Sequence, residues 1–176
     1  MTSSVIALIG YRGTGKTTVA QLLAMRLGYD WVDADVEVEL RAGKSIAAIF
    51  AESGEELFRD LEVAVVEDFC KREKTVLALG GGAVLRETNR HHLAAGEAVV
   101  WLQASAATIA KRLSEDPTSA QRRPNLTNHG GRTEIAELLR AREPIYRACA
   151  TLEVDTNNKG PTEIVDEIVA AIGDRG

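Results

Sequence analysis

A stretch of eight residues near the N-terminus carries groups that bind phosphate in many proteins. Residues 10–17 read GYRGTGKT and fit the pattern GxxxxGK[ST], in which backbone N–H groups surround phosphate oxygens. The glycines let the backbone curl, and a helix that follows adds the positive end of its dipole. Lys16 is the expected cation for the β- and γ-phosphates, and the Thr17 hydroxyl is an expected Mg²⁺ ligand. The pattern predicts a nucleotide phosphate site; the alternative is a glycine turn that only joins a strand to a helix.

Two aspartates, Asp33 and Asp35, stand at alternate positions in the next predicted strand. Alternation along an extended segment places both carboxylates on the same side. The predicted strands at 75–79 and 98–103 end without an acidic residue. We therefore expect one aspartate to organise Mg²⁺ and the other to accept a hydrogen bond or a proton from a substrate hydroxyl. Two alternatives remain: a solvated pair of acids that caps the next helix, and Asp155 as the metal carboxylate.

A basic segment stands out in a chain whose formal net charge is −5. Residues 117–133 contain Arg122, Arg123 and Arg132 and no acidic residue. A local basic loop on an acidic protein predicts a specific anion, with a solvated loop as the alternative. The net charge gives no indication of a nucleic-acid partner.

Hydrophobic periodicity predicts alternating strands and helices. The predicted strands are residues 5–9, 31–36, 75–79, 98–103 and 152–155. The first predicted helices are residues 17–27, a short one after Ser45, and a long one from a Ser53–Glu56 capping box to about 71. The later ones are residues 88–95, 105–113, and 133–148 with an interruption at Pro144, followed by a helix that begins at Pro161. Residues 117–131 form the longest irregular stretch, and such loops are usually functional.

Five strands that alternate with helices predict an α/β fold with a mainly parallel, doubly wound sheet. The length of 176 residues suits one domain, residues 1–176. No apolar run approaches the length of a membrane-spanning helix, and the first residues read as a strand and not as a signal peptide, so we expect a cytoplasmic protein without a membrane partner. Cys70 and Cys149 are expected to be free thiols, with a disulfide or a metal site as the alternative.

Six motifs, taken together, resemble those of shikimate kinases in order and approximate spacing. They are GYRGTGKT, Asp33-x-Asp35, Phe58-Arg59-x-x-Glu62, Gly80-Gly81-Gly82, Arg123-Pro124 and Arg142-x-Pro144-x-Tyr146. The resemblance covers essentially the whole chain. It implies a P-loop kinase with a three-layer fold, a substrate-binding helical segment at about 33–62 and a mobile lid at about 114–132. It also implies transfer of the γ-phosphoryl group of ATP, with Mg²⁺, to the 3-hydroxyl of shikimate, by a protein expected to be a monomer.

The resemblance implies a role for each matching residue around the substrate. Asp35 would hold the accepting hydroxyl, while Arg59 and Arg142 would bind the shikimate carboxylate. Gly80, Gly81 and Gly82 would let the backbone approach the ring hydroxyls. The side chains implied as walls of the pocket are those of Phe50, Phe58 and Pro124. Asp33 with Thr17 would organise the magnesium ion.

The resemblance also implies the nucleotide site. The implied ATP-binding residues are Gly10, Arg12, Gly13, Thr14, Gly15, Lys16, Thr17, Thr18, Arg112 and Arg123. Within this set, Lys16 and Arg123 would act in catalysis with Asp35, and Arg123 would reach the transferring phosphate from the lid. Arg112 would lie against adenine, with Lys111 as its rival. The chain departs from the family pattern at Asn125, where a leucine is common.

Some of these roles have support from the residues themselves. Glu62, three residues after Arg59, can orient that guanidinium, although a surface ion pair is the alternative. Pro144 is expected to kink its helix and aim Arg142 inward, with Arg140 and Arg147 as rivals. Two other functions remain open: a kinase for another hydroxy-acid such as gluconate, and a nucleotide-dependent switch without an acceptor.

Overall fold

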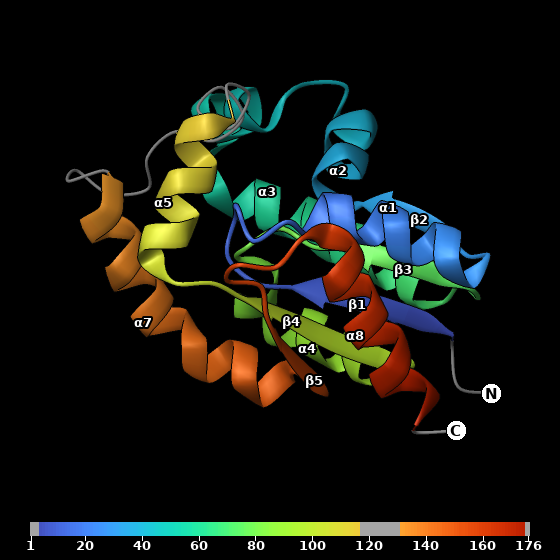
Figure 1. Ribbon diagram of the computed structural model, residues 1–176. Coiled ribbons are helices and arrows are strands. Elements are labelled where there is room, and N and C mark those ends of the chain that lie inside the picture. The colour runs from blue at the N-terminus through green and yellow to red at the C-terminus, as the bar shows by residue number, and fades with distance from the viewer. Residues whose placement is uncertain (1–3, 117–130, 175–176) are drawn as a thin grey trace.

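The computed structural model describes residues 4–116 and 131–174, in which five parallel strands form one sheet (Figure 1). The strands are β1 (Val5–Ile9), β2 (Asp30–Asp33), β3 (Thr75–Ala78), β4 (Ala98–Gln103) and β5 (Leu152–Asp155). Their order across the sheet is β2-β3-β1-β4-β5, and every neighbouring pair is parallel. The predicted α/β class and the parallel, doubly wound sheet are confirmed.

Helices cover both faces of the sheet. They are α1 (Lys16–Leu27), α2 (Ala34–Ala42), α3 (Ile46–Cys70), α4 (Glu87–Ala94), α5 (Ala106–Glu115), α7 (Gly131–Cys149) and α8 (Pro161–Gly173), with a short 3₁₀ helix, η1 (Ala83–Leu85). In Figure 1, α1 and α8 lie side by side over one face. Pro161 occupies the first turn of α8, as predicted, where its missing N–H removes no helical bond.

The central strand β1 divides the core into two layers by simple alternation. Ile6 and Leu8 point towards α1 and α8, whereas Val5, Ala7 and Ile9 join the cluster under α3, α4 and α7. All five residues are buried, which explains why this strand is apolar throughout. Because the strands are parallel, the carboxyl ends of β1, β2 and β3 meet at one edge of the sheet, and the site forms there.

Three local predictions are wrong. The second strand ends at Asp33, and helix α2 begins at Ala34, so the expected extended segment at 31–36 is too long. The break in α3 lies at Gly54, whose φ of 82° and ψ of 175° are non-helical, so Ser53 does not have the conformation of an N-cap. Helix α7 runs through Pro144 to Cys149 without the expected interruption.

Both cysteines are free thiols, as predicted. Cys70, the last residue of α3, is buried, and burial raises the pKa of its thiol to about 11. In the described part of the chain, no helix combines the length and the apolar character that crossing a membrane requires.

Candidate active site

The phosphate-binding loop leaves β1 and turns directly into α1. Gly10 has a φ of 141°, and a Cβ at this position would lie 2.5 Å from the carbonyl oxygen of Leu102, so only glycine fits. Gly15, with a φ of 93°, is the N-cap of α1. The loop therefore directs the N-terminus of α1 into the edge of the sheet where the strands end.

Lys16 holds the loop together from inside. The Lys16 residue is 8% exposed, and its ammonium group donates hydrogen bonds to the carbonyl oxygens of Gly10, at 2.7 Å, and Tyr11, at 2.8 Å. The Thr14 hydroxyl donates to the same Tyr11 oxygen at 2.8 Å. The cation that the sequence assigns to phosphate binding is thus also a structural element of the loop.

Asp33 and Asp35 lie beside the loop but belong to different elements. Asp33 ends β2 and caps α2, because its Oδ1 accepts from the backbone N–H of Asp35 at 2.9 Å and of Val36 at 3.3 Å. Its Oδ2 accepts from the Thr17 hydroxyl at 2.8 Å. Asp35 lies in the first turn of α2, so helix geometry, and not the alternation of a strand, brings its carboxylate to the site.

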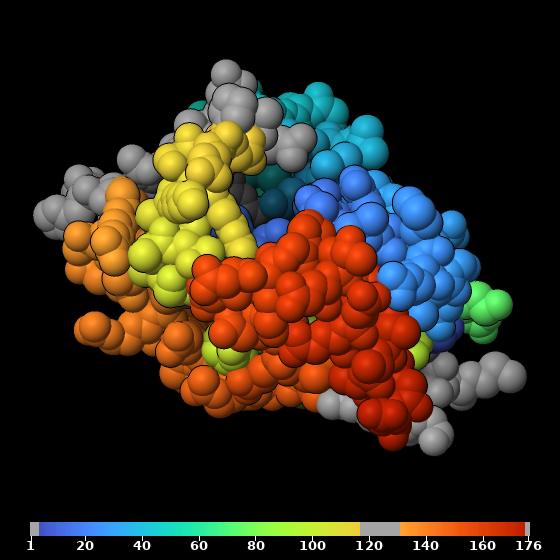
Figure 2. Space-filling view, viewed as in Figure 1, coloured from blue at the N-terminus to red at the C-terminus, as the bar shows by residue number. Residues whose placement is uncertain are grey.

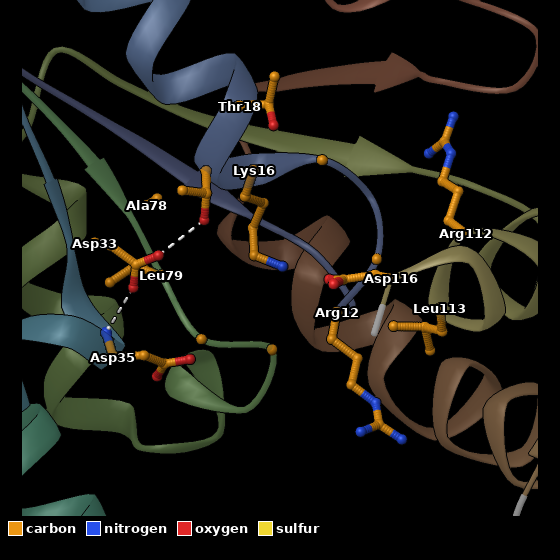
Figure 3. Close-up of a pocket in the computed structure, with 15 residues that line it drawn as sticks. Arg12, Lys16, Thr18, Asp33, Asp35, Ala78, Leu79, Arg112, Leu113 and Asp116 are labelled. Atoms are coloured by element: carbon orange, nitrogen blue, oxygen red, sulfur yellow. Dashed lines mark hydrogen bonds between the residues drawn. The ribbon is translucent and has the colours of Figure 1, made fainter. Parts of the chain in front are cut away.

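A cleft of about 350 Å³ opens between these groups. The residues that line it are Arg12, Gly13, Gly15, Lys16, Thr17, Thr18, Asp33, Asp35, Ala78, Leu79, Gly80, Gly81, Arg112, Leu113 and Asp116. Figure 2 shows the hollow between α5, in yellow, and the blue N-terminal elements. In Figure 3, Lys16 projects between the two aspartates on one side and Arg12 with Asp116 on the other.

Arg59 is buried, and two glutamates of its own helix hold its guanidinium in place. Its Nη1 donates to Oε1 of the fully buried Glu62 at 2.9 Å, which confirms the expected orienting pair. Its Nε and Nη2 both donate to Oε1 of Glu55, at 3.3 Å and 3.2 Å. Burial alone lowers the pKa of the guanidinium, but the charges and hydrogen bonds of Glu62 and Glu55 outweigh burial, so the pKa lies above its usual value.

Arg142 is the buried arginine of α7, while its rivals Arg140 and Arg147 are exposed. The Arg142 guanidinium lies 5.8 Å from the centre of the Tyr11 ring. Among the described residues, Arg142 makes no hydrogen bond and no salt bridge. A buried guanidinium without a carboxylate is costly, so this arrangement is typical of a site that receives an anion.

The triple glycine brings the two arginines together. A Cβ on Gly81 would lie 3.4 Å from Nη1 of Arg142, and a Cβ on Gly82 would lie 2.8 Å from Cζ of Arg59. The hydroxyl of the buried Tyr146 donates to the carbonyl oxygen of Gly81, one helical turn after Arg142. The absence of side chains on the turn therefore lets both guanidinium groups lie against its backbone.

Of the remaining predicted residues, Arg112 lines the cleft, and Phe50 and Phe58 do not. Phe50 and Phe58 pack against each other with ring centres 5.1 Å apart. Arg112 lines the cleft and donates to the side chain and the carbonyl oxygen of Thr156, at 3.0 Å and 2.8 Å, whereas its rival Lys111 is exposed. The predicted lid residues Arg123 and Pro124 lie outside the described residues, as does Asn125.

Sequence reasoning missed three contributors. Glu55 is spaced one turn before Arg59, and this spacing is a recognisable signal for an ion pair. Tyr146 is spaced one turn after Arg142 and belongs to a quoted motif, but its partner is far away in sequence. Nothing in the sequence identified Thr156 as the residue that holds Arg112.

Thr17 and Asp33 fit a magnesium ion that arrives with a nucleotide. Their oxygens lie 2.8 Å apart and are the hard ligands that Mg²⁺ prefers. In the described ranges, no group of three or more His, Cys, Asp or Glu side chains could hold a metal ion. Mg²⁺ in kinases commonly keeps several waters and takes one or two protein ligands in addition to phosphate oxygens, so this small donor set fits.

Comparison with known proteins gives a consistent result. The model of the shikimate kinase family matches residues 12–173. A shikimate kinase of Rhodopirellula baltica is 45% identical over 164 residues, which cover 93% of this chain and 88% of that protein. A shikimate kinase of Thermobifida fusca is 47% identical over 161 residues, which cover 92% and 90%. The solved shikimate kinase from Acinetobacter baumannii in complex with shikimate has a TM-score of 0.91 and 34% identity, and it covers 99% of this chain and 95% of its own.

Proposed function

Because this chain belongs to the shikimate kinase family, we infer that it transfers the γ-phosphoryl group of ATP to the 3-hydroxyl of shikimate. The observation that carries this function is the buried Arg142, which has no carboxylate partner among the described residues and lies beside the glycine turn next to the phosphate-binding loop. A nucleotide switch needs no second anion site of this kind.

On the nucleotide side, we propose that the loop from Gly10 to Thr18 binds the phosphates of ATP. Lys16 exchanges its carbonyl partners for phosphate oxygens, which is a small movement because its ammonium group already lies within the loop. Arg112, fixed by Thr156, supports the adenine. Mg²⁺, held through Thr17 and Asp33, would neutralise phosphate charge.

On the acceptor side, we propose that Arg142 and Arg59 bind the carboxylate of shikimate. The backbone of Gly80, Gly81 and Gly82 approaches the ring hydroxyls, and Phe50 with Phe58 lines the apolar side. Pro124, from the segment outside the described residues, is a further proposed wall. Asp35 then faces the hydroxyl that reacts.

The proposed reaction is an in-line displacement at phosphorus. The oxygen of the 3-hydroxyl forms a bond to the γ-phosphorus, the bond between that phosphorus and the bridging oxygen of ADP breaks, and the hydroxyl proton passes to the Asp35 carboxylate. Lys16 stabilises the charge that spreads over the phosphoryl oxygens. Arg123, also outside the described residues, is proposed to add a second positive charge from the lid.

A coupled assay of ADP release tests the function directly. We expect shikimate to stimulate ADP formation strongly, and we expect gluconate and a reaction without acceptor to give only a slow background rate. Equal stimulation by shikimate and gluconate would contradict the assignment of the acceptor. Strong ADP release without any acceptor would favour a nucleotide-dependent switch.

A further inference from the structure

The two arginines proposed to bind the acceptor carboxylate differ in their charge balance. Arg142 has no anionic partner among the described residues. Arg59 already faces two carboxylates, those of Glu62 and Glu55, so its guanidinium is paired before any ligand arrives. A substrate carboxylate placed on Arg59 would therefore meet the carboxylate of Glu55 as well as the guanidinium.

The two glutamates occupy different edges of the Arg59 guanidinium. Glu62 is fully buried and accepts a hydrogen bond from Nη1 at 2.9 Å, a distance typical of a strong charge-assisted hydrogen bond. Glu55 lies at the edge formed by Nε and Nη2. Its Oε1 alone accepts from both, at 3.3 Å from Nε and 3.2 Å from Nη2. That edge is one on which a carboxylate can form two parallel hydrogen bonds.

Glu55 is free to leave, whereas Glu62 is not. The Glu55 side chain is 57% exposed, and its 3.2 Å contact with Arg59 is longer than the 2.9 Å contact of Glu62. It directly follows Gly54, where α3 is non-helical. Water can solvate the departing carboxylate of Glu55, and Glu62 keeps the guanidinium in place after it has left.

From these contacts we propose that Glu55 is an internal competitor of the substrate carboxylate and thereby sets the affinity for the acceptor. This inference rests on the proposed function. The substrate carboxylate pairs first with Arg142 and then displaces Glu55 from the Nε–Nη2 edge of Arg59. Glu62 is a positioning residue that holds Arg59 throughout.

The inference predicts that removal of the Glu55 charge makes shikimate bind more tightly. In Glu55→Gln, we expect the dissociation constant for shikimate, measured calorimetrically with the full chain, to fall about two- to fivefold, the range that an exposed ion pair is worth. Glu55→Ala should change it in the same direction, because it removes both the charge and the competing acceptor. The dissociation constant for ADP should stay unchanged in both variants.

Two controls make the test specific for charge at this edge. Glu56→Gln alters the net charge equally, and Glu56 is exposed and forms no hydrogen bond or ion pair with Arg59. This variant should bind shikimate as the wild type does. The carboxamide of shikimate lacks the negative charge, so its dissociation constant should be the same for Glu55→Gln and the wild type.

The possible failures are distinguishable. If the wild type binds shikimate and Glu55→Gln binds it equally or more weakly, Glu55 is not a competitor and the inference is wrong. A gain that also occurs with Glu56→Gln, or with the carboxamide, likewise overturns it. If the wild type does not bind shikimate at all, the proposed function itself fails, and the inference fails with it.

Discussion

At the scale of single residues, Asp33 and Asp35 show how two adjacent carboxylates acquire different chemistry. Both oxygens of Asp33 have donors, namely the Thr17 hydroxyl and the first backbone N–H groups of α2. Asp35 lies two residues further along, in the first turn of α2, and faces the cleft (Figure 3). Asp33 is therefore suited to organise a metal ion together with Thr17, and Asp35 is suited to contact a substrate.

Replacement of each aspartate by asparagine should separate these roles. We expect Asp35→Asn to lower kcat about 10²- to 10⁴-fold, the usual contribution of a general base, while MgATP binding is retained. Asp33→Asn should instead require a higher magnesium concentration for half-maximal activity, and α2 should persist because asparagine is also a good N-cap. Steady-state kinetics with a magnesium titration measures both. A normal kcat for Asp35→Asn would remove Asp35 from the chemistry.

At the scale of elements, the glycine turn after β3 is the point where side chains from two helices meet. Helix α3 contributes Arg59, helix α7 contributes Arg142 and Tyr146, and all three side chains lie against Gly81 or Gly82. The absence of side chains on this turn, and not only its backbone conformation, therefore determines where the guanidinium groups lie.

A single methyl group on this turn should displace Arg59. In Gly82→Ala, the new Cβ would lie 2.8 Å from Cζ of Arg59, a guanidinium that Glu62 holds from the other side. We expect KM for shikimate to rise about tenfold or more, since part of a charged hydrogen-bond contact is lost, and KM for ATP to change little. Gly160→Ala is the matched control, because nothing lies within 4 Å of a Cβ there. An unchanged KM for shikimate would show that the turn tolerates a side chain.

At the scale of the whole molecule, the parallel sheet brings distant segments to one edge. The phosphate-binding loop, the aspartates and the triple glycine follow β1, β2 and β3, which are neighbours in the sheet but far apart in sequence. In the proposed function, the nucleotide side and the acceptor side share the edge but use different residues. Each ligand should therefore stabilise the fold through its own contacts.

Thermal unfolding can measure the two sides independently. At about 100 times its dissociation constant, a ligand adds about 2.7 kcal/mol to the free energy of unfolding, which raises Tm by about 5–10 °C for a chain of this size. We expect ADP and shikimate each to produce such a shift in the wild type. In Arg142→Lys, the planar fork is lost, so the shift at the same shikimate concentration should shrink while the ADP shift is retained. Loss of the ADP shift instead would place Arg142 in the nucleotide site.

The sequence by itself determined the features that depend on short-range pattern. The fully apolar run from Val5 to Ile9 followed by GYRGTGKT predicts a buried strand, a phosphate-binding turn and a helix, because hydrophobic periodicity and glycine content act over a few residues. The five strands and the parallel sheet follow from the same alternation. The Arg59–Glu62 pair was also predictable, since residues three apart on a helix are neighbours.

Only the tertiary structure decided which residues face the site. Arg140, Arg142 and Arg147 have the same chemistry in sequence, but the rotation of α7 against the sheet buries only Arg142. Helix α2 begins at Ala34 because the Asp33 side chain caps it, so helix geometry, and not strand alternation, sets the position of Asp35. The hydroxyl of Tyr146 meets Gly81, and Arg142 lies beside it, across a separation of more than 60 residues. Such contacts depend on how whole elements pack, and no local pattern records that packing.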